Sequence, residues 1–305
     1  MEEEKVLITV IGDRALIFSL DDVKRLRDLK VTGVLSGTLP IATQQNIFLG
    51  LPLQLMSEEV VYLVLNRYGY LVPSKFFYNN LLSSSTDGDL EKFLELKNEI
   101  FQSQTKQKEL DNLVKQKNLV NNNNNNGNGN SHLVLHKGSN NESTFFYEID
   151  NQSLKSYPSY KSFQKYYDKS DIQLKLLNEF FMKNGGDLLM ANCNMFSYLL
   201  SKNYYIAPGL KFGGNFIAYP GDPLNYHSHL IVNVIQDFYT DDIGLNRIVN
   251  GGRLATSVKK IWTIGGNKNG NKSYKDLRFP PNNETLHQQQ QQDLVCFSIE
   301  WSGFG

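Results

Sequence analysis

The sequence predicts an α+β protein, with a small N-terminal α/β unit and a C-terminal mixed-sheet domain flanked by helices. Its 305 residues exceed one typical domain, so we expect two folded units or one unit with a large insertion. Hydrophobic residues make up 40% of the chain, which is enough for a sizeable core. Short β-type runs dominate both ends of the chain, whereas apolar residues at helical spacing lie between them.

The N-terminal unit is expected to span residues 1–80. Its first two β-type runs are separated by Gly12-Asp13. Asp21 and Asp22 come after the second run, and acidic residues are typical of a helix N-terminus because of the helix dipole. Glycine and proline make residues 33–40 a turn-rich segment. The expected elements are strands at 6–10 and 15–18, a helix from 21 to 27, an apolar helix at 57–65 and a last strand at 70–73.

Residues 81–170 are expected to be an insertion of low complexity. A charged, intermittently apolar pattern at 89–117 is typical of an exposed helix. Six consecutive asparagines at 121–126 are followed by alternating Gly and Asn. Such a tract cannot bury enough apolar surface to offset the loss of chain entropy, so we expect part of the insertion to be disordered.

The C-terminal domain is expected to span residues 171–305. Apolar residues at helical spacing lie on either side of Gly185-Gly186, which predicts two helices separated at the glycines. Strand signals dominate afterwards, and a polar loop with glutamines at 288–292 separates the last two strands. The expected elements are strands at 217–219, 230–235, 260–264 and 294–299, with a short helix at about 243–250.

Composition excludes several classes of protein. Thirty-one Lys and Arg residues balance thirty-one Asp and Glu residues, so any contact with nucleic acid has to be local. No window reaches the roughly 18 consecutive apolar residues of a membrane span, and the acidic start is unlike a signal peptide. We therefore expect an intracellular protein without membrane insertion. Cys193 and Cys296 stand alone, which fits neither a disulfide scaffold nor a zinc site.

The densest cluster of potential site residues runs from Tyr204 to Pro223 and is followed by His227 and His229. Gly221-Asp222-Pro223 after a strand predicts a fixed turn, because glycine tolerates unusual φ values and proline restricts its own. Two histidines at this spacing suit a metal pair, but no third ligand follows at an obvious spacing. The other interpretation is general acid catalysis, because imidazole exchanges its proton near neutral pH.

Basic residues accumulate without acidic neighbours from Ile243 to Lys275. In a chain with no formal net charge, such a segment is a candidate phosphate contact, although a solvated loop is the alternative for its last part. Lys260 differs from the others because it opens an apolar strand and so has a defined direction. The seven basic residues are Arg247, Arg253, Lys259, Lys260, Lys268, Lys272 and Lys275.

These motifs resemble a known family. The cluster from Tyr205 to His229, together with residues 252–260, resembles the catalytic domain of tRNA-splicing endonuclease subunits. Residues 33–40 and 45–53 resemble a signature of the smaller catalytic subunit of the eukaryotic four-subunit enzyme, which is the subunit assigned to the 3′ splice site. The resemblance implies a restriction-endonuclease-like fold for the C-terminal domain.

The resemblance covers residues from about 5 to 75 and from 185 to 305. Two positions depart from the family pattern within it. Asn203 stands where glycine is common, and Asn215 stands where an acidic residue is common. Neither position belongs to the catalytic residues that the resemblance implies, so the departures concern local loop geometry.

The resemblance also implies the roles of individual residues. It makes Tyr219 the base for the 2′-hydroxyl, His227 the acid for the departing 5′-oxygen and Lys260 the cation that stabilises the phosphorane. The reaction that it implies needs no metal or cofactor and leaves a 2′,3′-cyclic phosphate and a 5′-hydroxyl. Because a free phenol loses its proton only near about pH 10, Tyr219 acts either as the base or by orienting the nucleophile.

The expected partners follow from the same resemblance. Arg253 matches an arginine that helps to pinch an intron base by cation-π contact, and Lys259 and Arg247 are expected to bind RNA with it. The predicted partners are precursor tRNA and the other subunits of the endonuclease, which are a second catalytic subunit and two structural ones. The expected compartment is the nucleus.

Three alternatives stay open from the sequence. One is a non-catalytic, architectural subunit of the same complex, against which the presence of Tyr219, His227 and Lys260 argues. A second is a pure RNA-binding module, in which Tyr219 and His227 stack on bases. A third is a metal-dependent nuclease with Asp222 and Lys260 in its centre, which needs more carboxylates than this region offers.

Overall fold

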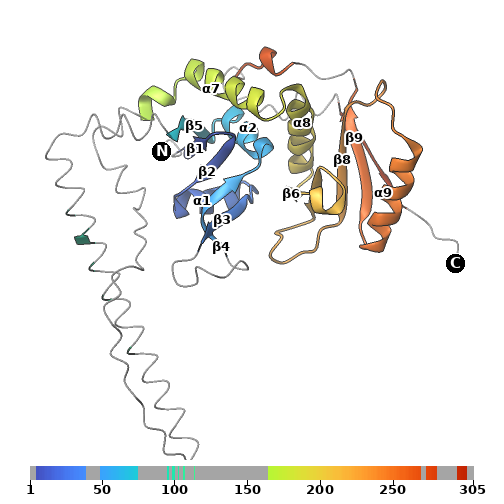
Figure 1. Ribbon diagram of the computed structural model, residues 1–305, viewed down its shortest axis with the longest axis horizontal. Coiled ribbons are helices and arrows are strands. Elements are labelled where there is room, and N and C mark those ends of the chain that lie inside the picture. Colours follow the sequence, from blue (N-terminus) through green and yellow to red (C-terminus); the bar gives the residue numbers. More distant parts are fainter. Residues whose placement is uncertain are drawn as a thin grey trace, which may run out of the picture.

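The computed structural model describes residues 5–38, 49–74, 164–268, 273–279 and 294–300, together with isolated positions between 95 and 113. These residues form two five-stranded mixed sheets with helices between and outside them, which confirms the predicted α+β class (Figure 1). The expected insertion at 81–170 lies largely outside the described residues, and the glutamine-rich loop at 288–292 lies wholly outside them. The domain boundaries therefore stay predictions.

The N-terminal sheet is built from the first five strands of the chain. Its elements are β1 (Val6–Ile11), β2 (Arg14–Ile17), α1 (Leu20–Asp28), β3 (Val34–Thr38), β4 (Leu49–Leu55), α2 (Ser57–Leu65) and β5 (Gly69–Pro73). The strand order is β3-β4-β2-β1-β5, in which β1 and β5 are parallel and the other neighbours antiparallel. The three strands and two helices predicted for this unit are confirmed. Ser19 begins α1, because its hydroxyl accepts the N–H of Asp22.

β3 is a strand where the sequence predicts a turn-rich segment. Its residues pair with β4 in an antiparallel ladder whose register shifts between Leu35 and Gly37. A Cβ on Gly37 would lie 1.7 Å from the backbone oxygen of Leu51. The glycine is therefore required by the close approach of two strands, and the turn prediction for 33–40 is wrong over Val34–Thr38.

The C-terminal sheet is built from the last five strands, which follow two helices. Its elements are α7 (Ser170–Lys183), α8 (Asp187–Ser201), β6 (Tyr205–Pro208), η2 (Leu210–Phe212), β7 (Phe216–Tyr219), β8 (Leu230–Asp237), α9 (Leu245–Ser257), β9 (Ile261–Asn267), η3 (Tyr274–Asp276) and β10 (Leu294–Ile299). The strand order is β10-β9-β8-β7-β6, and β8 and β9 are the parallel pair. The two helices at Gly185-Gly186 and the four predicted strands are confirmed, whereas edge strand β6 has no counterpart among the predicted elements. None of the described helices combines the length and apolar content that a membrane span needs.

α9 is longer than the short helix expected at 243–250. That expectation ends just before Gly251-Gly252, and glycine disfavours a helix interior. A Cβ on Gly251 would lie 2.4 Å from the indole of Trp262, so the glycine allows α9 to pack closely on β9. Packing on the sheet thus extends the helix to Ser257 against its local propensity.

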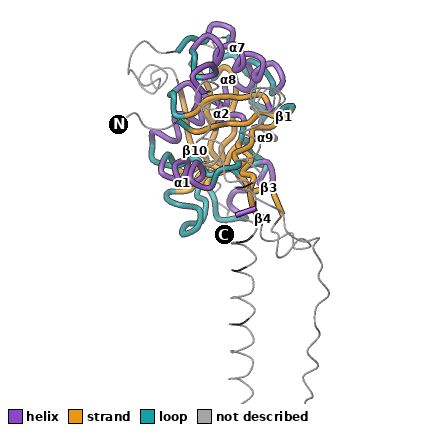
Figure 2. The backbone as a smooth tube through the Cα atoms, turned by 90° about the vertical axis from the view of Figure 1, so that its left-hand side faces the viewer, coloured by secondary structure: helices purple, strands orange, loops and turns teal. Residues whose placement is uncertain are grey.

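The two sheets are joined through α2 and α8, which pack against each other between them (Figure 1). Tyr62 of α2 contacts Phe196 of α8 edge to face, with ring centres 5.9 Å apart. One hydrophobic core holds residues of both sheets, including Ile8 of β1 and Phe216 of β7. α9 covers the opposite face of the C-terminal sheet, and α7 lies across the top of the molecule in both views (Figure 2). The described parts of both units therefore form one packed body.

α7 follows the predicted boundary at 171 but packs on the N-terminal sheet. The side chain of Gln173 is buried and pairs with the backbone of Leu71 in β5, accepting its N–H at 2.7 Å and donating to its oxygen at 2.9 Å. The same amide donates to the backbone oxygen of Tyr167 at 2.8 Å. A buried amide satisfied in this way fixes α7 to the edge of β5.

Glu59 of α2 is a buried carboxylate that ties together the segments before α2 and after α1. Its oxygens accept the N–H groups of Met56 at 2.8 Å, Gly33 at 3.0 Å and Thr32 at 3.2 Å. Its side chain is fully buried. Burial raises the pKa of Glu59 to about 7, because removal from water disfavours the charged form more than the three donors favour it.

We expect Glu59→Gln to weaken the pH dependence of folding stability. Between the ordinary carboxyl pKa of 4.5 and the raised pKa of about 7, the folded chain holds a proton that the unfolded chain has lost. The free energy of unfolding therefore falls as pH rises through this window, by at most about 1.4 kcal/mol per pH unit for one group. Urea denaturation of the purified chain at a series of pH values measures this slope.

The matched control is Glu179→Gln, which changes an exposed glutamate of α7. This variant should keep the wild-type slope, whereas Glu59→Gln should lose less stability than the wild type as pH rises through the same window. A wild-type slope in Glu59→Gln would contradict the raised pKa.

Candidate active site

The topology of the C-terminal sheet brings the three predicted catalytic residues to one end of three adjacent strands. Tyr219 is the last residue of β7, Lys260 immediately precedes β9, and His227 lies in the loop that enters β8. β7 runs antiparallel to β8, and β8 runs parallel to β9, with Leu230 at the start of both ladders. The C-terminal end of β7 therefore meets the N-terminal ends of β8 and β9.

Tyr219 and Lys260 project to the same face of the sheet. Side chains alternate along a strand, and Ile217 of β7 and Trp262 of β9 belong to one hydrophobic cluster on the α9 face. Tyr219 packs partly buried against this cluster. The ammonium nitrogen of Lys260 lies 5.4 Å from the ring centre of Phe212 in η2, a cation-π contact that restricts its direction.

The end of α9 sets the direction in which the backbone enters β9 at Lys260. Lys259 adopts a left-handed conformation with φ 54°, and its N–H donates to the oxygen of Thr256 at 3.1 Å. The N–H of Lys260 donates to the oxygen of Ala255 at 2.8 Å. A left-handed residue with such hydrogen bonds commonly ends a helix, and glycine is the usual residue at that position. The direction of the strand is therefore set at Lys260.

His227 is exposed, but both ends of its loop are fixed. Ser228 after it is buried, and the N–H of His229 donates to the oxygen of Ala218 in β7 at 2.9 Å. The oxygen of His229 accepts the N–H of Ile261 in β9 at 2.8 Å. His229 therefore belongs to the sheet, whereas the imidazole of His227 is free to meet a ligand in solvent.

Asp222 organises the other end of the loop. Its carboxylate accepts the N–H of Leu224 at 2.9 Å, and its backbone oxygen accepts the N–H groups of Asn225 at 2.9 Å and Tyr226 at 3.0 Å. The guanidinium of Arg27 in α1 donates to both carboxylate oxygens, at 2.8 and 3.0 Å. The predicted turn at Gly221-Asp222-Pro223 is present, but nothing in the sequence pattern pairs it with Arg27, which lies 195 residues away.

The geometry does not favour a metal centre at Asp222. Both of its carboxylate oxygens are engaged by Arg27, and one of them also serves the turn. Among the residues that the structure describes, no three His, Cys, Asp or Glu side chains gather where they could hold a metal ion. The donor set around Asp222 is therefore that of a structural turn, and the metal independence of the reaction stays a prediction.

The three predicted RNA-binding residues lie on α9 and the link after it. Arg253 and Lys259 are exposed, and Lys259 is next to Lys260. Arg247 is exposed in the first turn of α9 and donates to the side-chain oxygen of Asn233 at 3.3 Å. Arg247 lies at the start of α9, whereas the predicted triad of Tyr219, His227 and Lys260 lies near the end of this helix. A rise of about 1.5 Å per residue along α9 therefore separates Arg247 from the triad.

Asn203, which departs from the family pattern, explains why glycine is common at its position. Its φ is 71°, in the left-handed region that asparagine enters more easily than other side chains. Its side-chain oxygen also accepts a hydrogen bond from Lys30, which follows α1. Asn215, the second departure, accepts the N–H of Val234 in β8 at 2.9 Å. Both asparagines therefore take a defined part in the loop geometry around the sheet.

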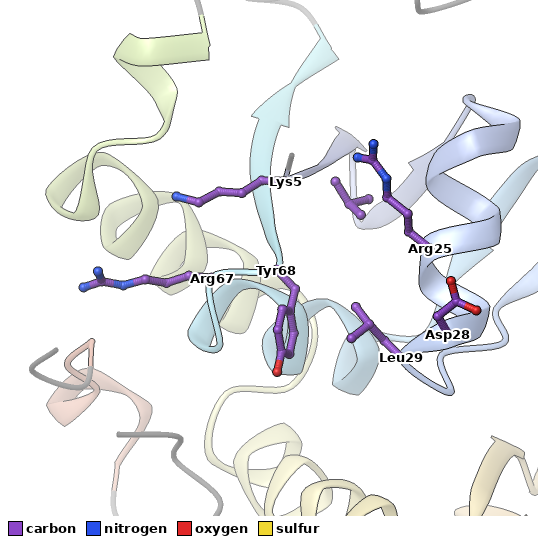
Figure 3. A pocket seen from close by; sticks show the side chains of 7 residues that line it. Lys5, Arg25, Asp28, Leu29, Arg67 and Tyr68 are labelled. Atoms are coloured by element: carbon purple, nitrogen blue, oxygen red, sulfur yellow. The ribbon is translucent and has the colours of Figure 1, made fainter. Parts of the chain in front are cut away.

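A concave region lies on the N-terminal unit. It encloses about 370 Å³ and includes the side chains of Lys5, Arg25 and Arg67 (Figure 3). Lys5 and Arg67 extend to one side, whereas Arg25 lies across from them on α1 (Figure 3). Lys5 pairs with Asp168 at 2.5 Å. None of the predicted triad lines this hollow, and its cations do not converge on one point.

Two family models match the chain. The TSEN34-like, N-terminal domain matches residues 6–74, and the catalytic C-terminal domain of tRNA intron endonucleases matches residues 189–274. The second match contains the whole of the predicted triad. Neither match reaches the expected insertion at 81–170.

Two relatives resemble nearly the entire chain, and a third resembles a shorter stretch of it. The tRNA-splicing endonuclease subunit SEN34 of Saccharomyces cerevisiae is 34% identical over 300 residues, which are 95% of this chain and 99% of the relative. The probable tRNA-splicing endonuclease subunit sen34 of Schizosaccharomyces pombe is 32% identical over 315 residues, at 100% of both chains. A tRNA-splicing endonuclease of Pyrobaculum aerophilum is 33% identical over 70 residues, which are 23% of this chain and 37% of the relative.

We expect Gly221→Ala to loosen the turn that precedes His227. A Cβ on Gly221 would lie 2.6 Å from the ring of Tyr226, so the ring has to move. The amides of Asn225 and Tyr226 should then exchange hydrogen faster, because their bonds to Asp222 depend on the same turn. The melting temperature should fall by no more than about 4 °C, because the ring is on the surface.

Gly244→Ala is the matched control, because a Cβ on Gly244 has nothing within 4 Å. Amide exchange in the loop should be unchanged in this variant. Equal exchange at Asn225 and Tyr226 in both variants would show that the turn does not depend on the packing of Tyr226 over Gly221.

Proposed function

This chain belongs to the SEN34 family of tRNA-splicing endonuclease subunits, and we propose that it carries the active site that cleaves precursor tRNA at the 3′ splice site. The chain is an endonuclease subunit with a catalytic domain of the tRNA intron endonuclease type. The observation that carries the proposal is the meeting of the chain segments of Tyr219, His227 and Lys260 at one end of β7, β8 and β9.

In the proposed reaction, the 2′-hydroxyl of the nucleotide before the cut attacks the adjacent phosphorus in line with the departing 5′-oxygen. Tyr219 takes the proton of the 2′-hydroxyl or orients this group, and His227 gives a proton to the 5′-oxygen as the P–O bond breaks. The products are a 2′,3′-cyclic phosphate and a 5′-hydroxyl. Atoms and charge balance without water or a metal ion, since one proton is taken and one is given.

Lys260 suits the stabilisation of the phosphorane. Lys260 is half-buried and its ammonium is held beside Phe212, so it does not have to be ordered when substrate binds. Negative charge grows on the non-bridging oxygens during attack, and a cation fixed near them lowers the barrier more than a mobile one. His227 is exposed on the neighbouring strand end, where an RNA backbone has access to it.

We further propose that Arg253, Lys259 and Arg247 bind RNA. Arg253 is exposed on α9, which leaves its guanidinium available for a base or a phosphate. Lys259 is exposed beside Lys260, so it suits a phosphate next to the scissile one. Arg247 lies at the other end of α9, and its proposed contact is with RNA farther from the cut.

The relatives are named as subunits of an endonuclease, which implies that this chain works with other subunits. We propose a second catalytic subunit and two structural subunits as its partners, precursor tRNA as its substrate and the nucleus as its compartment. In such an assembly, recognition by RNA shape decides which bond reaches the active site.

We expect Tyr219→Phe and His227→Ala to remove one of the two cuts of the assembled endonuclease. Loss of a positioned acid or base slows the chemical step by about 10²- to 10⁴-fold. The 3′ cut should be slowed by this factor, whereas the 5′ cut and the affinity for precursor tRNA should stay within about 2-fold. A single-turnover assay with end-labelled precursor measures both cuts.

Tyr239→Phe serves as a control, because Tyr239 is 71% exposed on the loop after β8, at the opposite end of that strand from the three proposed catalytic residues. It should cleave at the wild-type rate. Retained 3′ cleavage in His227→Ala would instead support the architectural subunit, and lost affinity for precursor tRNA would support the RNA-binding module.

We expect cleavage to continue in excess EDTA, with spermidine present to keep the precursor tRNA folded. The proposed chemistry is supplied by Tyr219, His227 and Lys260, so a chelator has nothing to remove from it. Analysis of the fragment ends should find a cyclic phosphate and a 5′-hydroxyl. Loss of the 3′ cut on chelation, followed by recovery on addition of magnesium, would overturn the proposal in favour of a metal-dependent nuclease.

A further inference from the structure

We propose that Arg27, in the N-terminal unit, is a positioning residue for the cleavage reaction. Through its ion pair with Asp222, it fixes the turn that presents His227. The proposal rests on the proposed role of His227 as the acid. It assigns to the N-terminal unit a part in catalysis that neither its sequence pattern nor its family match describes.

The ion pair has the geometry of a specific contact. One guanidinium nitrogen of Arg27, Nη2, donates to both carboxylate oxygens of Asp222, at 2.8 and 3.0 Å. The two side chains are only 31% and 32% exposed, so solvent and salt screen the pair less than they screen a fully exposed one. Because both carboxylate oxygens are engaged, the contact restricts rotation of the Asp222 carboxylate, although a single nitrogen of the guanidinium makes both bonds.

Asp222 transmits this restraint to the loop. Its carboxylate accepts the N–H of Leu224, and its backbone oxygen accepts the N–H groups of Asn225 and Tyr226. His227 is the next residue along the chain. A rotation of Asp222 would therefore carry the whole turn with it and displace the imidazole.

The part of the chain that carries Arg27, the end of α1, is itself fixed to the catalytic sheet. Arg27 lies in the last turn of α1, and the segment after α1 contacts β6, where the hydroxyl of Thr32 donates to the oxygen of Ile206 at 3.2 Å. On α8, the side chain of Asn192 donates to Glu58 of α2 at 3.0 Å. The shared core of α2 and α8 joins the same two units. Arg27 therefore reaches the loop from a support that is packed against the catalytic sheet.

The loop thus has two anchors of different origin. The sheet holds its C-terminal end at His229, and Arg27 holds its N-terminal end at Asp222. General acid transfer requires hydrogen-bond distance to the leaving oxygen, and a displacement of about 1 Å costs as much as 10²-fold in rate. An exposed histidine with one free loop end would sample many positions, so the second anchor matters to the rate.

The test uses Arg27→Ala in the assembled endonuclease, with precursor tRNA in single-turnover assays. We expect the 3′ cut at saturating precursor to slow by about 10- to 100-fold, while affinity for precursor stays within about 2-fold. Arg27→Lys should keep only part of the rate, because its ammonium retains the charge but is more strongly hydrated and sits on a flexible stem. Asp222→Asn should slow the same cut, and the double variant should be no slower than the slower single one, because the two residues act as a unit.

Lys24→Ala is the matched control. It removes a cation from the same helix whose partner, Asp21, is on α1 itself. This variant should cleave at the wild-type rate. Hydrogen exchange supplies a readout independent of rate: the amides of residues 224–226 should exchange faster in Arg27→Ala, whereas those of α8 should not change.

The outcomes separate this inference from the proposed function. If Arg27→Ala and Asp222→Asn both cleave like Lys24→Ala while His227→Ala is inactive, the positioning role is overturned and the proposed function stands. If His227→Ala keeps its 3′ cut, the proposed function and the positioning role of Arg27 are both overturned. Should Arg27→Ala fail to assemble, Asp222→Asn answers the same question from the other side of the ion pair, because its amide can still accept the N–H of Leu224.

Discussion

The parallel pairing of β8 and β9 is the constraint on which the candidate site depends. Parallel neighbours need a crossover connection, and α9 supplies it by packing over the sheet. The crossover returns the chain to the end at which β8 began, so Lys260 arrives beside the loop of His227. The antiparallel neighbour β7 ends there with Tyr219. Side chains from the end of β7, the loop before β8 and the start of β9 thus reach one end of the sheet through strand order.

The close packing of α9 shows how this crossover is stabilised. Gly251 allows the helix to approach Trp262, and the left-handed Lys259 closes it just before β9 begins. Residues that are unfavourable for a helix or a turn when considered alone are required here by the geometry of the crossover. The direction of Lys260 is therefore set by the packing of α9 as well as by its own contact with Phe212.

The features that the sequence predicts are those with a local signal. Continuous apolar runs predict β8, β9 and β10, and the family motif predicts the positions of Tyr219, His227 and Lys260. β3 and β6 are edge strands whose order comes from pairing with a neighbour, so glycine and proline in them are typical of turns. Arg27 leaves no local signal at all, because its partner Asp222 lies 195 residues away in the other unit.

The contact between Arg27 and Asp222 also bears on why two units are packed into one body. A catalytic sheet could hold a tyrosine and a lysine at its strand ends, since strands are rigid, but an exposed histidine on a loop needs support from outside the sheet. The N-terminal unit supplies that support from a position fixed by the shared core. Loss of packing between α2 and α8 would thus remove this support from the His227 loop. With the roles proposed for His227 and Arg27, the active site is therefore complete only when both sheets are in place.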